Sequence, residues 1–323
     1  MRIAVDAMGS DTAPLPEIEG VVAALKERKD IEVTLVGKQD LIEKELACFD
    51  TTGMPITIHH SPTVIDMGES PSKALKTKPE ASLCQTIGLQ KMGKVDASIS
   101  AGNTGAFMGA SLFGLGRIEN VNRPAIGVTM PTVAGFSFCL DMGANSDCKP
   151  QHLFQFARMG EIFAEYVLDK KNPSIGLLSV GEEPGKGNEA TVATHAMLAS
   201  SLMNFAGNIE GNGVIFDKAD VIVCDGFVGN ILLKFYESIP HFIYTTVGDL
   251  FVGERAQNFL EKFNKDTYGA ADLLGVNGVV LICHGSSSAT AIKNAVLKAE
   301  KMVLKKVNER IRQVMLKDPQ CFE

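Results

Sequence analysis

The sequence predicts a three-layer α/β/α protein in which helices cover both faces of a mostly parallel, mixed sheet. Short β-branched runs alternate along the chain with helix-length segments whose apolar residues recur every three or four positions. A repeated strand–helix–strand order implies right-handed crossovers between parallel strands. The chain has 323 residues, 45% hydrophobic and 21% charged, and is long enough for one large α/β unit or for two lobes that share a sheet. We expect a single α/β enzyme unit over residues 1–323.

The predicted strands are short runs of mainly apolar and β-branched residues. They are 2–6, 31–36, 55–60, 97–100, 125–130, 136–140, 174–180, 221–225 and 279–284. The connection PTVAG that follows residue 130 is too short for a crossover helix, so the two strands it joins should form an antiparallel hairpin. The sheet is therefore predicted to be mixed.

The helical pattern covers 16–29 after the first strand and 151–168 after the sixth. Residues 226–271 predict a long helical arm, kinked or broken at Pro240, which serves core packing or dimerisation. Residues 288–316 predict one amphipathic helix that is strongly basic, since 293–317 contain eight basic side chains and two acidic ones. Its basic face is either solvated or a landing surface for an acidic partner or a membrane.

Charge and apolar patterning exclude several classes of protein. The net charge is −7 and the main body has no basic tract, so we expect no nucleic-acid partner. The start MRIAVDAMGSD lacks the pattern of a secretory signal, and no apolar run approaches the ~18–20 residues that span a bilayer. We therefore expect a soluble, cytoplasmic protein.

The seven cysteines stand singly, without the pairs or His clusters of a zinc site. We expect neither disulfides nor a metal, and no cofactor. Most cysteines lie in apolar runs typical of the core, and Cys148, in a polar run, is the exception that we expect to be exposed.

Six turns that follow predicted strands carry the residues suited to ligand binding, because ligands of open α/β sheets sit at the carboxyl ends of strands. They are 6–11 (DAMGSD), 100–106 (SAGNTGA), 141–145 (DMGAN), 181–188 (GEEPGKGN), 225–230 (DGFVGN) and 284–288 (HGSSS). In SAGNTGA, two glycines precede an apolar helix, so backbone N–H groups can approach an anion at the helix N-terminus. A tight turn with an Asn or Thr cap would give the same pattern.

The turn GEEPGKGN places Lys186 between two glycines ahead of a helix over 189–204. It lacks the full P-loop signature, and the pairs Gly185/Gly187 and Gly211/Gly213 lack the third glycine of a dinucleotide fingerprint. Neither nucleotide hydrolysis nor dinucleotide binding is indicated. Lys186 is either a ligand-binding residue or a solvated lysine.

Together and in this order, these turns resemble the phosphate acyltransferases of bacterial phospholipid synthesis, and the resemblance covers residues 1 to about 297. It implies conversion of fatty acyl-[acyl carrier protein] and inorganic phosphate into acyl phosphate, which feeds glycerol-3-phosphate acylation. It further implies a fold like that of the isocitrate and isopropylmalate dehydrogenases and of phosphotransacetylase, and a homodimer built through the second half of the chain. Two departures affect loop geometry: Ser179 stands where the family has Asn, and Ala270 replaces a glycine.

The predicted chemistry needs two anions placed against a carbonyl, with donors for the oxyanion. We assign catalytic roles to Lys186, Asn230 and His284. The other predicted site residues bind phosphate or substrate: Asp6, Gly9, Ser100, Gly102, Asn103, Thr104, Gly105, Asn145, Gly187, Asn188, Gly229 and Ser286. We expect Asp6, Asp141 and Asp225 to cap turns and not to act as bases.

A covalent acyl-enzyme is disfavoured, because Ser286 lies in no nucleophile elbow and the apolar strands around Cys224 and Cys283 should raise a thiol pKa. A metal-dependent hydroxy-acid dehydrogenase would need converging carboxylates. The only compact carboxylate set is Asp217, Asp220 and Asp225.

The chain could instead be a regulator that binds a carrier protein or an acyl chain. Such a regulator would need no catalytic lysine or histidine.

Two contact surfaces are also predicted. The carrier protein would dock on the basic C-terminal helix or on Lys73, Lys76 and Lys78. Weak peripheral contact with a membrane, or with a membrane acyltransferase, would use an apolar face bordered by basic residues near the tip of the arm. That face consists of Phe251, Phe259, Leu260 and Phe263, bordered by Arg255, Lys262 and Lys265.

Overall fold

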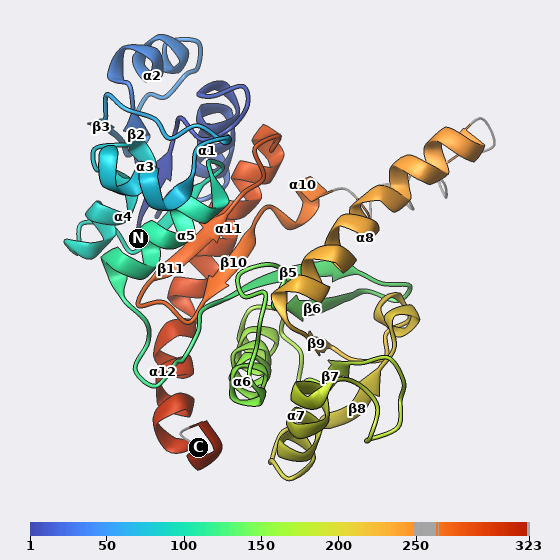
Figure 1. Cartoon of the computed structure of the whole chain (residues 1–323). Helices are drawn as coiled ribbons and strands as arrows, with labels where there is room; N and C mark the ends of the chain where they lie inside the picture. The colour runs from blue at the N-terminus through green and yellow to red at the C-terminus, as the bar shows by residue number, and fades with distance from the viewer. Residues whose placement is uncertain (249–252, 254–262, 264, 322–323) are drawn as a thin grey trace. The chain divides into compact units, whose positions relative to one another are not determined.

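The computed structural model describes residues 1–248, 253, 263 and 265–321, and the chain divides into two compact units. Unit 1 comprises residues 1–118 and 265–308, and unit 2 comprises 119–264 and 309–323. Both contain mostly parallel strands with helices packed against them (Figure 1). The expectation that the two act as a single enzyme unit stays a prediction.

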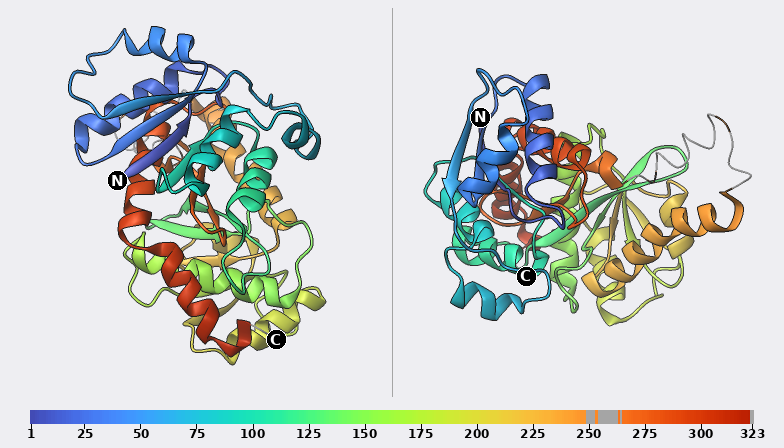
Figure 2. Two further views of the ribbon diagram at one scale, coloured as in Figure 1. Left: turned by 90° about the vertical axis from the view of Figure 1, so that its left-hand side faces the viewer. Right: turned by 90° about the horizontal axis from the view of Figure 1, so that it is seen from above.

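The strands of unit 1 are ordered β3-β2-β1-β4-β11-β10. All neighbours are parallel except β10 and β11, which are antiparallel. Figure 2 shows β1, β2 and β3 side by side in blue. The bounds are β1 Arg2–Asp6, β2 Glu32–Gly37, β3 Ile56–His60, β4 Ala97–Ser100, β10 Ala271–Leu274 and β11 Val279–Ile282.

The helices of unit 1 cover both faces of these strands. The chain steps from β1 to β2 in one direction and from β3 back to β4 in the other, so right-handed crossovers put α1 and α4 on opposite faces. Gly20 lets α1 pack closely on α11, since a Cβ there would lie 2.6 Å from the Ala289 carbonyl oxygen. The bounds are α1 Leu15–Glu27, α2 Gln39–Leu46, α3 Pro71–Thr77, α4 Ser82–Lys91, α5 Thr104–Leu115, α10 Lys265–Tyr268 and α11 Ala289–Leu304.

In unit 2 the strand order is β5-β6-β9-β7-β8, with β5 and β6 as the predicted antiparallel hairpin and the other neighbours parallel. Stacked Phe138 and Phe163, with ring centroids 4.0 Å apart, join β6 to α6 in the core. The strands are β5 Ala125–Pro131, β6 Phe136–Leu140, β7 Ile175–Leu178, β8 Phe205–Ile209 and β9 Val221–Val223.

The helices of unit 2 are α6 Pro150–Tyr166, α7 Glu189–Ala199, α8 Gly226–Val247 and α12 Val307–Lys317. Short 3-10 turns lie at Gly211–Ile215 and Pro319–Cys321.

The predicted strands are all present, but β8 and β10 were not predicted. The predicted break at Pro240 is wrong, because α8 continues through that residue as one helix (Figure 1). Proline removes a single N–H, and the remaining turns of this 22-residue helix keep theirs. No described helix is both long enough and apolar enough to cross a membrane.

The single helix predicted for 288–316 is also wrong. Instead, α11 ends at Leu304 and α12 begins at Val307, because Lys306 adopts the left-handed conformation with φ 54°. Asn308 contributes to this bend, since its side chain donates to the carbonyl oxygens of Val276 and Gly278, both at 2.8 Å. These hydrogen bonds join Asn308 to carbonyl groups 32 and 30 residues away in the sequence. The helical periodicity of residues 288–316 carries no information about them.

Candidate active site

The 100–106 turn of unit 1 is organised by a buried carboxylate. Asp6, at the end of β1, is 1% exposed and accepts hydrogen bonds from the Ser100 hydroxyl at 2.6 Å and the Met8 N–H at 3.1 Å. The Ser100 Oγ in turn accepts the N–H of Gly102 at 3.0 Å. Burial raises the pKa of Asp6, and hydrogen bonds, of which that from Ser100 is the largest, oppose the rise. Asp6 therefore shapes the turn.

Gly9 and Gly105 stand where a side chain would clash with a neighbouring segment. A Cβ on Gly9 would lie 2.5 Å from the Gly102 nitrogen, which is too close for any side chain. A Cβ on Gly105 would lie 2.7 Å from Cγ of Pro71 at the start of α3. The turns after β1 and β4 therefore meet at the N-terminus of α5, where the backbone N–H groups of Thr104 and Gly105 lack intrahelical acceptors.

The amide of Asn103 has a different role from the one predicted. Its Oδ1 caps α5 by accepting the Ala106 N–H at 3.0 Å. Its Nδ2 donates to three carbonyl oxygens of one loop, those of Asp66, Met67 and Glu69, at 3.1–3.2 Å. The side chain thus ties the 66–69 loop to the start of α5, and the anion-binding donors at this turn are backbone N–H groups.

The turn after β11 joins the same cluster. Asp11 donates its N–H to the Gly285 carbonyl at 2.7 Å, which ties the turn after β1 to the turn after β11. The Ser286 N–H donates to Nδ1 of His284 at 3.2 Å, and the Ser286 Oγ lies 2.9 Å from the same nitrogen. Because Nδ1 accepts a backbone N–H, the neutral ring carries its proton on Nε2. His284 and Ser286 are both exposed.

Unit 2 repeats the buried-aspartate arrangement. Asp141, at the end of β6, is 0% exposed and accepts from the backbone N–H groups of Ile126, Gly143, Ala144 and Asn145 at 2.7–3.3 Å. The Asn145 Nδ2 also donates to Asp141, at 2.8 Å. Burial raises the Asp141 pKa, and these hydrogen bonds oppose the rise. The 141–145 turn is therefore rigidly held.

Asn145 and Asn230, both predicted to bind substrate, differ in orientation. The Asn145 Nδ2 donates inward to Asp141 and to the Pro124 carbonyl at 2.7 Å, so this amide stabilises the turn. Asn230 is exposed in the first turn of α8, with its Oδ1 3.5 Å from where a Cβ on Gly143 would lie. Gly229 permits this approach, since a Cβ there would lie 2.0 Å from the Asp141 carbonyl oxygen.

The loop that carries Lys186 follows β7. The Lys186 N–H donates to the Glu183 carbonyl at 3.0 Å, and the Lys186 carbonyl accepts from the Ser179 hydroxyl at 3.0 Å. Gly187 has φ +115°, a conformation that favours glycine, and the Asn188 Oδ1 caps α7 by accepting the Thr191 N–H at 2.8 Å. Lys186 itself is exposed, so its ammonium can reach a ligand.

The predicted site residues therefore form two sets. Unit 1 brings together Asp6, Gly9, Ser100, Gly102, Asn103, Thr104, Gly105, His284 and Ser286 through the contacts above. In unit 2, Asn145, the Lys186 loop and Asn230 follow the adjacent parallel strands β6, β7 and β9. That the two sets act on one substrate stays a prediction.

Glu17 was not predicted as a site residue, yet it holds the turn after β1 in place. Glu17 is 0% exposed on α1, and its Oε1 accepts the Ser10 N–H at 2.9 Å. Burial raises the Glu17 pKa to about 7. One signal could have found it: Glu17 stands four residues before Val21 on the apolar face of α1.

Cys148, Cys224 and Cys283 offer no activated thiolate. Cys224 and Cys283 are buried, and burial raises the Cys283 pKa to about 12 and that of Cys224 well above its ordinary value. Cys148 is half-buried and not exposed as expected, and burial, with the charges of Asp141 and Asp225, raises its pKa to about 12.

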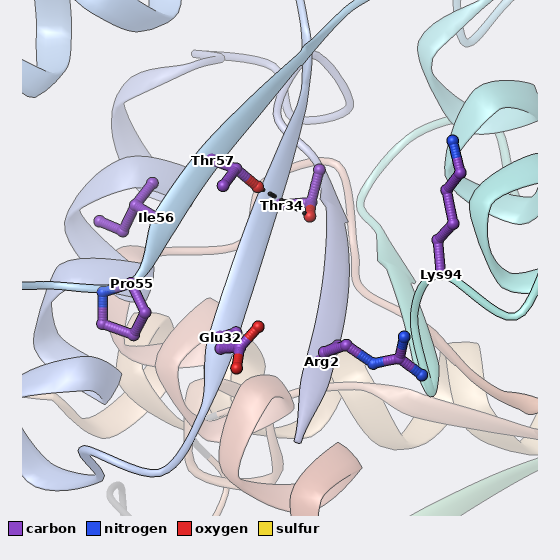
Figure 3. A pocket seen from close by; sticks show the side chains of 7 residues that line it. All are labelled: Arg2, Glu32, Thr34, Pro55, Ile56, Thr57 and Lys94. Carbon is purple, nitrogen blue, oxygen red and sulfur yellow. Dashed lines mark hydrogen bonds between the residues drawn. The ribbon is translucent and has the colours of Figure 1, made fainter.

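A separate cavity of about 140 Å³ lies at the opposite ends of the strands of unit 1 (Figure 3). Arg2, Glu32 and Ile56 line it at the amino ends of β1, β2 and β3, and the Thr34 and Thr57 hydroxyls hydrogen-bond across it at 3.0 Å. None of the predicted site residues lies there. Since ligands of such sheets bind at the carboxyl ends, the cavity is not the candidate site.

The fold and the glycine-rich strand ends define an α/β protein with anion-binding turns at the carboxyl ends of its strands. A phosphotransacetylase from Streptococcus pyogenes shares the fold with a TM-score of 0.61 and 18% identity over 94% of both chains. A branched-chain phosphotransacylase from Enterococcus faecalis V583 gives 0.60 and 15%, covering 94% of this chain and 99% of that one.

Sequence relatives identify the family. The model of the family described as Fatty acid synthesis protein matches residues 1–310, and the chain belongs to this family. The phosphate acyltransferase of Geobacter sulfurreducens is 43% identical over 98% of this chain and 94% of its own length. That of Pelobacter propionicus is 45% identical over 96% and 93%. The chain is thus an enzyme of the phosphate acyltransferase class.

Proposed function

We propose that this enzyme transfers a fatty acyl group from acyl carrier protein to inorganic phosphate and releases acyl phosphate for glycerol-3-phosphate acylation. An oxygen of hydrogen phosphate attacks the thioester carbonyl carbon, the carbon–sulfur bond breaks, and the proton of the phosphate passes to the departing sulfur. Phosphate is already nucleophilic at neutral pH and a thiol leaves readily, so placement and charge stabilisation supply the catalysis.

The observation that carries the proposal is the geometry at the N-terminus of α5. The Gly9–Gly102 contact leaves this turn without side-chain bulk, and Asn103 turns its amide inward. What faces outward is the positive end of a 12-residue helix with the N–H groups of Thr104 and Gly105. Such a site suits a tetrahedral anion that must itself react, because backbone donors hold it without a competing nucleophile.

Two side chains of unit 2 supply the remaining charge and donors in this mechanism. Lys186, on a loop fixed at both its N–H and carbonyl groups, neutralises the phosphate or the developing oxyanion. Asn230, exposed beside Gly143, donates to the reacting carbonyl or to phosphate.

His284 assists the leaving group. Its Nδ1 accepts the Ser286 N–H, so Nε2 carries the ring proton and can donate a hydrogen bond to the departing sulfur while the proton of the phosphate passes to that sulfur. Direct attack without an acyl-enzyme is favoured by the buried, high-pKa thiols of Cys224 and Cys283. The Ser100 hydroxyl is likewise committed to Asp6.

We also propose a cytoplasmic homodimer that uses α8. This helix leaves Phe227, Ile231, Phe235, Phe242 and Tyr244 each more than half exposed, an unusual density of apolar side chains for a solvated helix. Most of the proposed membrane-contact face, namely Phe251, Phe259, Leu260, Arg255 and Lys262, lies outside the described residues.

The carrier-protein surface is proposed on α3. Lys78 is paired with Glu69 at 2.6 Å, whereas Lys73 and Lys76 are exposed on the same helix. The C-terminal helices use part of their charge internally: Lys293 pairs with Glu27 at 2.6 Å and Lys298 with Asp272 at 3.0 Å.

One assay tests the main proposal: purified protein with acyl-carrier-protein thioesters of several chain lengths and labelled phosphate should yield labile acyl phosphate. A folded protein that yields none would overturn it. If the protein is instead a carrier-binding regulator, Lys186→Ala and His284→Ala should leave its function intact.

The dehydrogenase alternative requires carboxylates that converge on one site. Asp217 accepts from Thr132, Asp220 pairs with Lys170 at 3.0 Å, and Asp225 caps α8. Each carboxylate thus serves a partner of its own. Reduction of a nicotinamide cofactor with hydroxy acids would revive the alternative.

A further inference from the structure

A chain of hydrogen bonds runs from α7 and β8 to the loop that carries Lys186. Nδ1 of His195 lies 2.9 Å from Oδ1 of Asn208, and Nδ2 of Asn208 donates to the Glu183 carbonyl at 2.9 Å. The same carbonyl accepts the N–H of Lys186 at 3.0 Å. One carbonyl oxygen therefore links a buried side chain of β8 to the backbone of Lys186.

The Glu183 carbonyl decides which atom is donor and which is acceptor in each of these hydrogen bonds. A carbonyl oxygen only accepts, so the Asn208 atom that faces Glu183 is Nδ2 and the atom that faces His195 is Oδ1. Nδ1 of His195 must then carry a proton, in the neutral ring as well as in the cation. Phe205 packs edge-on against the His195 ring with centroids 5.0 Å apart, which holds the ring in this orientation.

The carbonyl side of Lys186 is held separately. The Ser179 hydroxyl donates to the Lys186 carbonyl at 3.0 Å, so both backbone polar groups of this residue are fixed. The lysine stem lies over Gly181, where a Cβ would be 2.9 Å from its Cγ. In a loop whose residues 182–188 are all exposed, these bonds are what restrict the direction of the side chain.

We propose that His195, Asn208 and Ser179 are positioning residues for Lys186, and we call these three the Lys186 brace. The proposal rests on the proposed function, in which Lys186 neutralises the reacting anion. Their side-chain hydrogen bonds go to one another, to Glu183 and to Lys186, so we assign them no catalytic role of their own. They act by restricting the directions in which the Lys186 ammonium can point, and Ser179 does so through its hydroxyl.

The first test reads loop order without any reaction. Trypsin can cleave after Lys186, and Asn208→Ala should speed cleavage at that bond roughly 3- to 10-fold, the factor expected when local opening loses one hydrogen bond. The matched control is Asn204→Ala, which removes an amide bonded to the Asn172 carbonyl at 3.0 Å just before β8. It should leave cleavage at Lys186 unchanged. Equal cleavage in wild type and Asn208→Ala would overturn the proposal.

The second test reads catalytic use. With acyl-carrier-protein thioester and phosphate, Asn208→Ala and Ser179→Ala should each lower kcat/KM roughly 10- to 100-fold, the loss expected from a displaced catalytic group. Ser179→Thr, which keeps the hydroxyl, should restore activity. In a Lys186→Gln background the Asn208→Ala loss should vanish, because the brace acts only through the lysine.

The outcomes separate the two proposals. If wild type makes no acyl phosphate, the proposed function fails, while the trypsin result still decides whether the brace orders the loop. If wild type is active and Asn208→Ala costs the same factor with and without Lys186, Asn208 only supports the fold and the positioning role is wrong. Urea unfolding of each variant checks that the fold is retained.

Discussion

Ser100 donates a buried hydrogen bond of 2.6 Å to Asp6, and the same hydroxyl accepts the N–H of Gly102. Two adjacent parallel strands, β1 and β4, thereby share one polar joint directly beneath the proposed phosphate site. The joint uses the serine hydroxyl both as donor and as acceptor, so the turn depends on it for both stability and shape.

Ser100→Ala should therefore lower the free energy of unfolding by about 1–3 kcal/mol, because it leaves a buried carboxylate short of a donor. It should also raise KM for phosphate, since the Gly102 N–H loses its acceptor. Urea unfolding and steady-state kinetics measure the two effects. Ser98→Ala is the control: Ser98 is buried two residues earlier on β4 and donates to the Thr86 carbonyl at 3.3 Å. An equal rise in KM for both variants would contradict the assignment.

Glu17 should make stability depend on pH. Burial raises its pKa from 4.5 to about 7, so the folded state holds this proton where the unfolded chain has lost it. The free energy of unfolding should fall as pH rises from 4.5 to 7 and then level off. Glu17→Gln keeps an oxygen for the Ser10 N–H and should remove this slope, with a gain on the order of 2 kcal/mol at pH 8.

Urea unfolding at several pH values, compared with exposed Glu19→Gln, measures the Glu17 effect. The same slope in wild type and Glu17→Gln would mean that another group titrates.

Removal of the catalytic side chains should slow turnover strongly and leave the fold intact. Lys186→Ala and His284→Ala should each lower kcat/KM by roughly 10²–10³, the usual loss of one group that stabilises developing charge. Both are exposed, so unfolding midpoints should hardly change. Lys171→Ala, an exposed lysine of unit 2, serves as the control. Unchanged turnover in Lys186→Ala would refute its assigned role.

The apolar face of α8 should govern oligomeric state. Phe235, 68% exposed, would be buried in the proposed dimer, and Phe235→Asp should yield monomers because an interface would bury an unpaired charge. Sedimentation velocity measures this, with Thr245→Asp as a control on an exposed polar position of α8. A wild-type monomer would remove the basis of the dimer proposal.

The strands could be predicted from sequence because most are continuous apolar runs bounded by turn residues. β8 (FAGNI) and β10 (ADLL) were missed because Gly207, Asn208 and Asp272 interrupt the pattern. These polar residues are buried with partners from other elements: Asn208 bonds to Glu183 and His195, and Asp272 pairs with Lys298.

The candidate turns were also predictable, since glycines at strand ends stand out. The side-chain roles were less so. Asn103 and Asn145 were expected to face ligand, but their amides bond to carbonyls of Asp66–Glu69 and of Pro124. Partners 20 or more residues away leave no local pattern. Backbone shape could thus be predicted from sequence, whereas amide orientation required the fold.

The order β1-β4-β11 has a consequence for synthesis of the chain. β11 pairs with β4 across almost 180 residues of sequence, and all the strands of unit 2 lie in between. On the ribosome, β5 to β9 can assemble while β4, which can already pair with β1, still lacks its second neighbour β11. The unit that emerges first is therefore the last to be completed. Nascent chains released before residue 282 should therefore expose an unpaired strand edge next to the 100–106 turn, a form open to aggregation and to capture by chaperones.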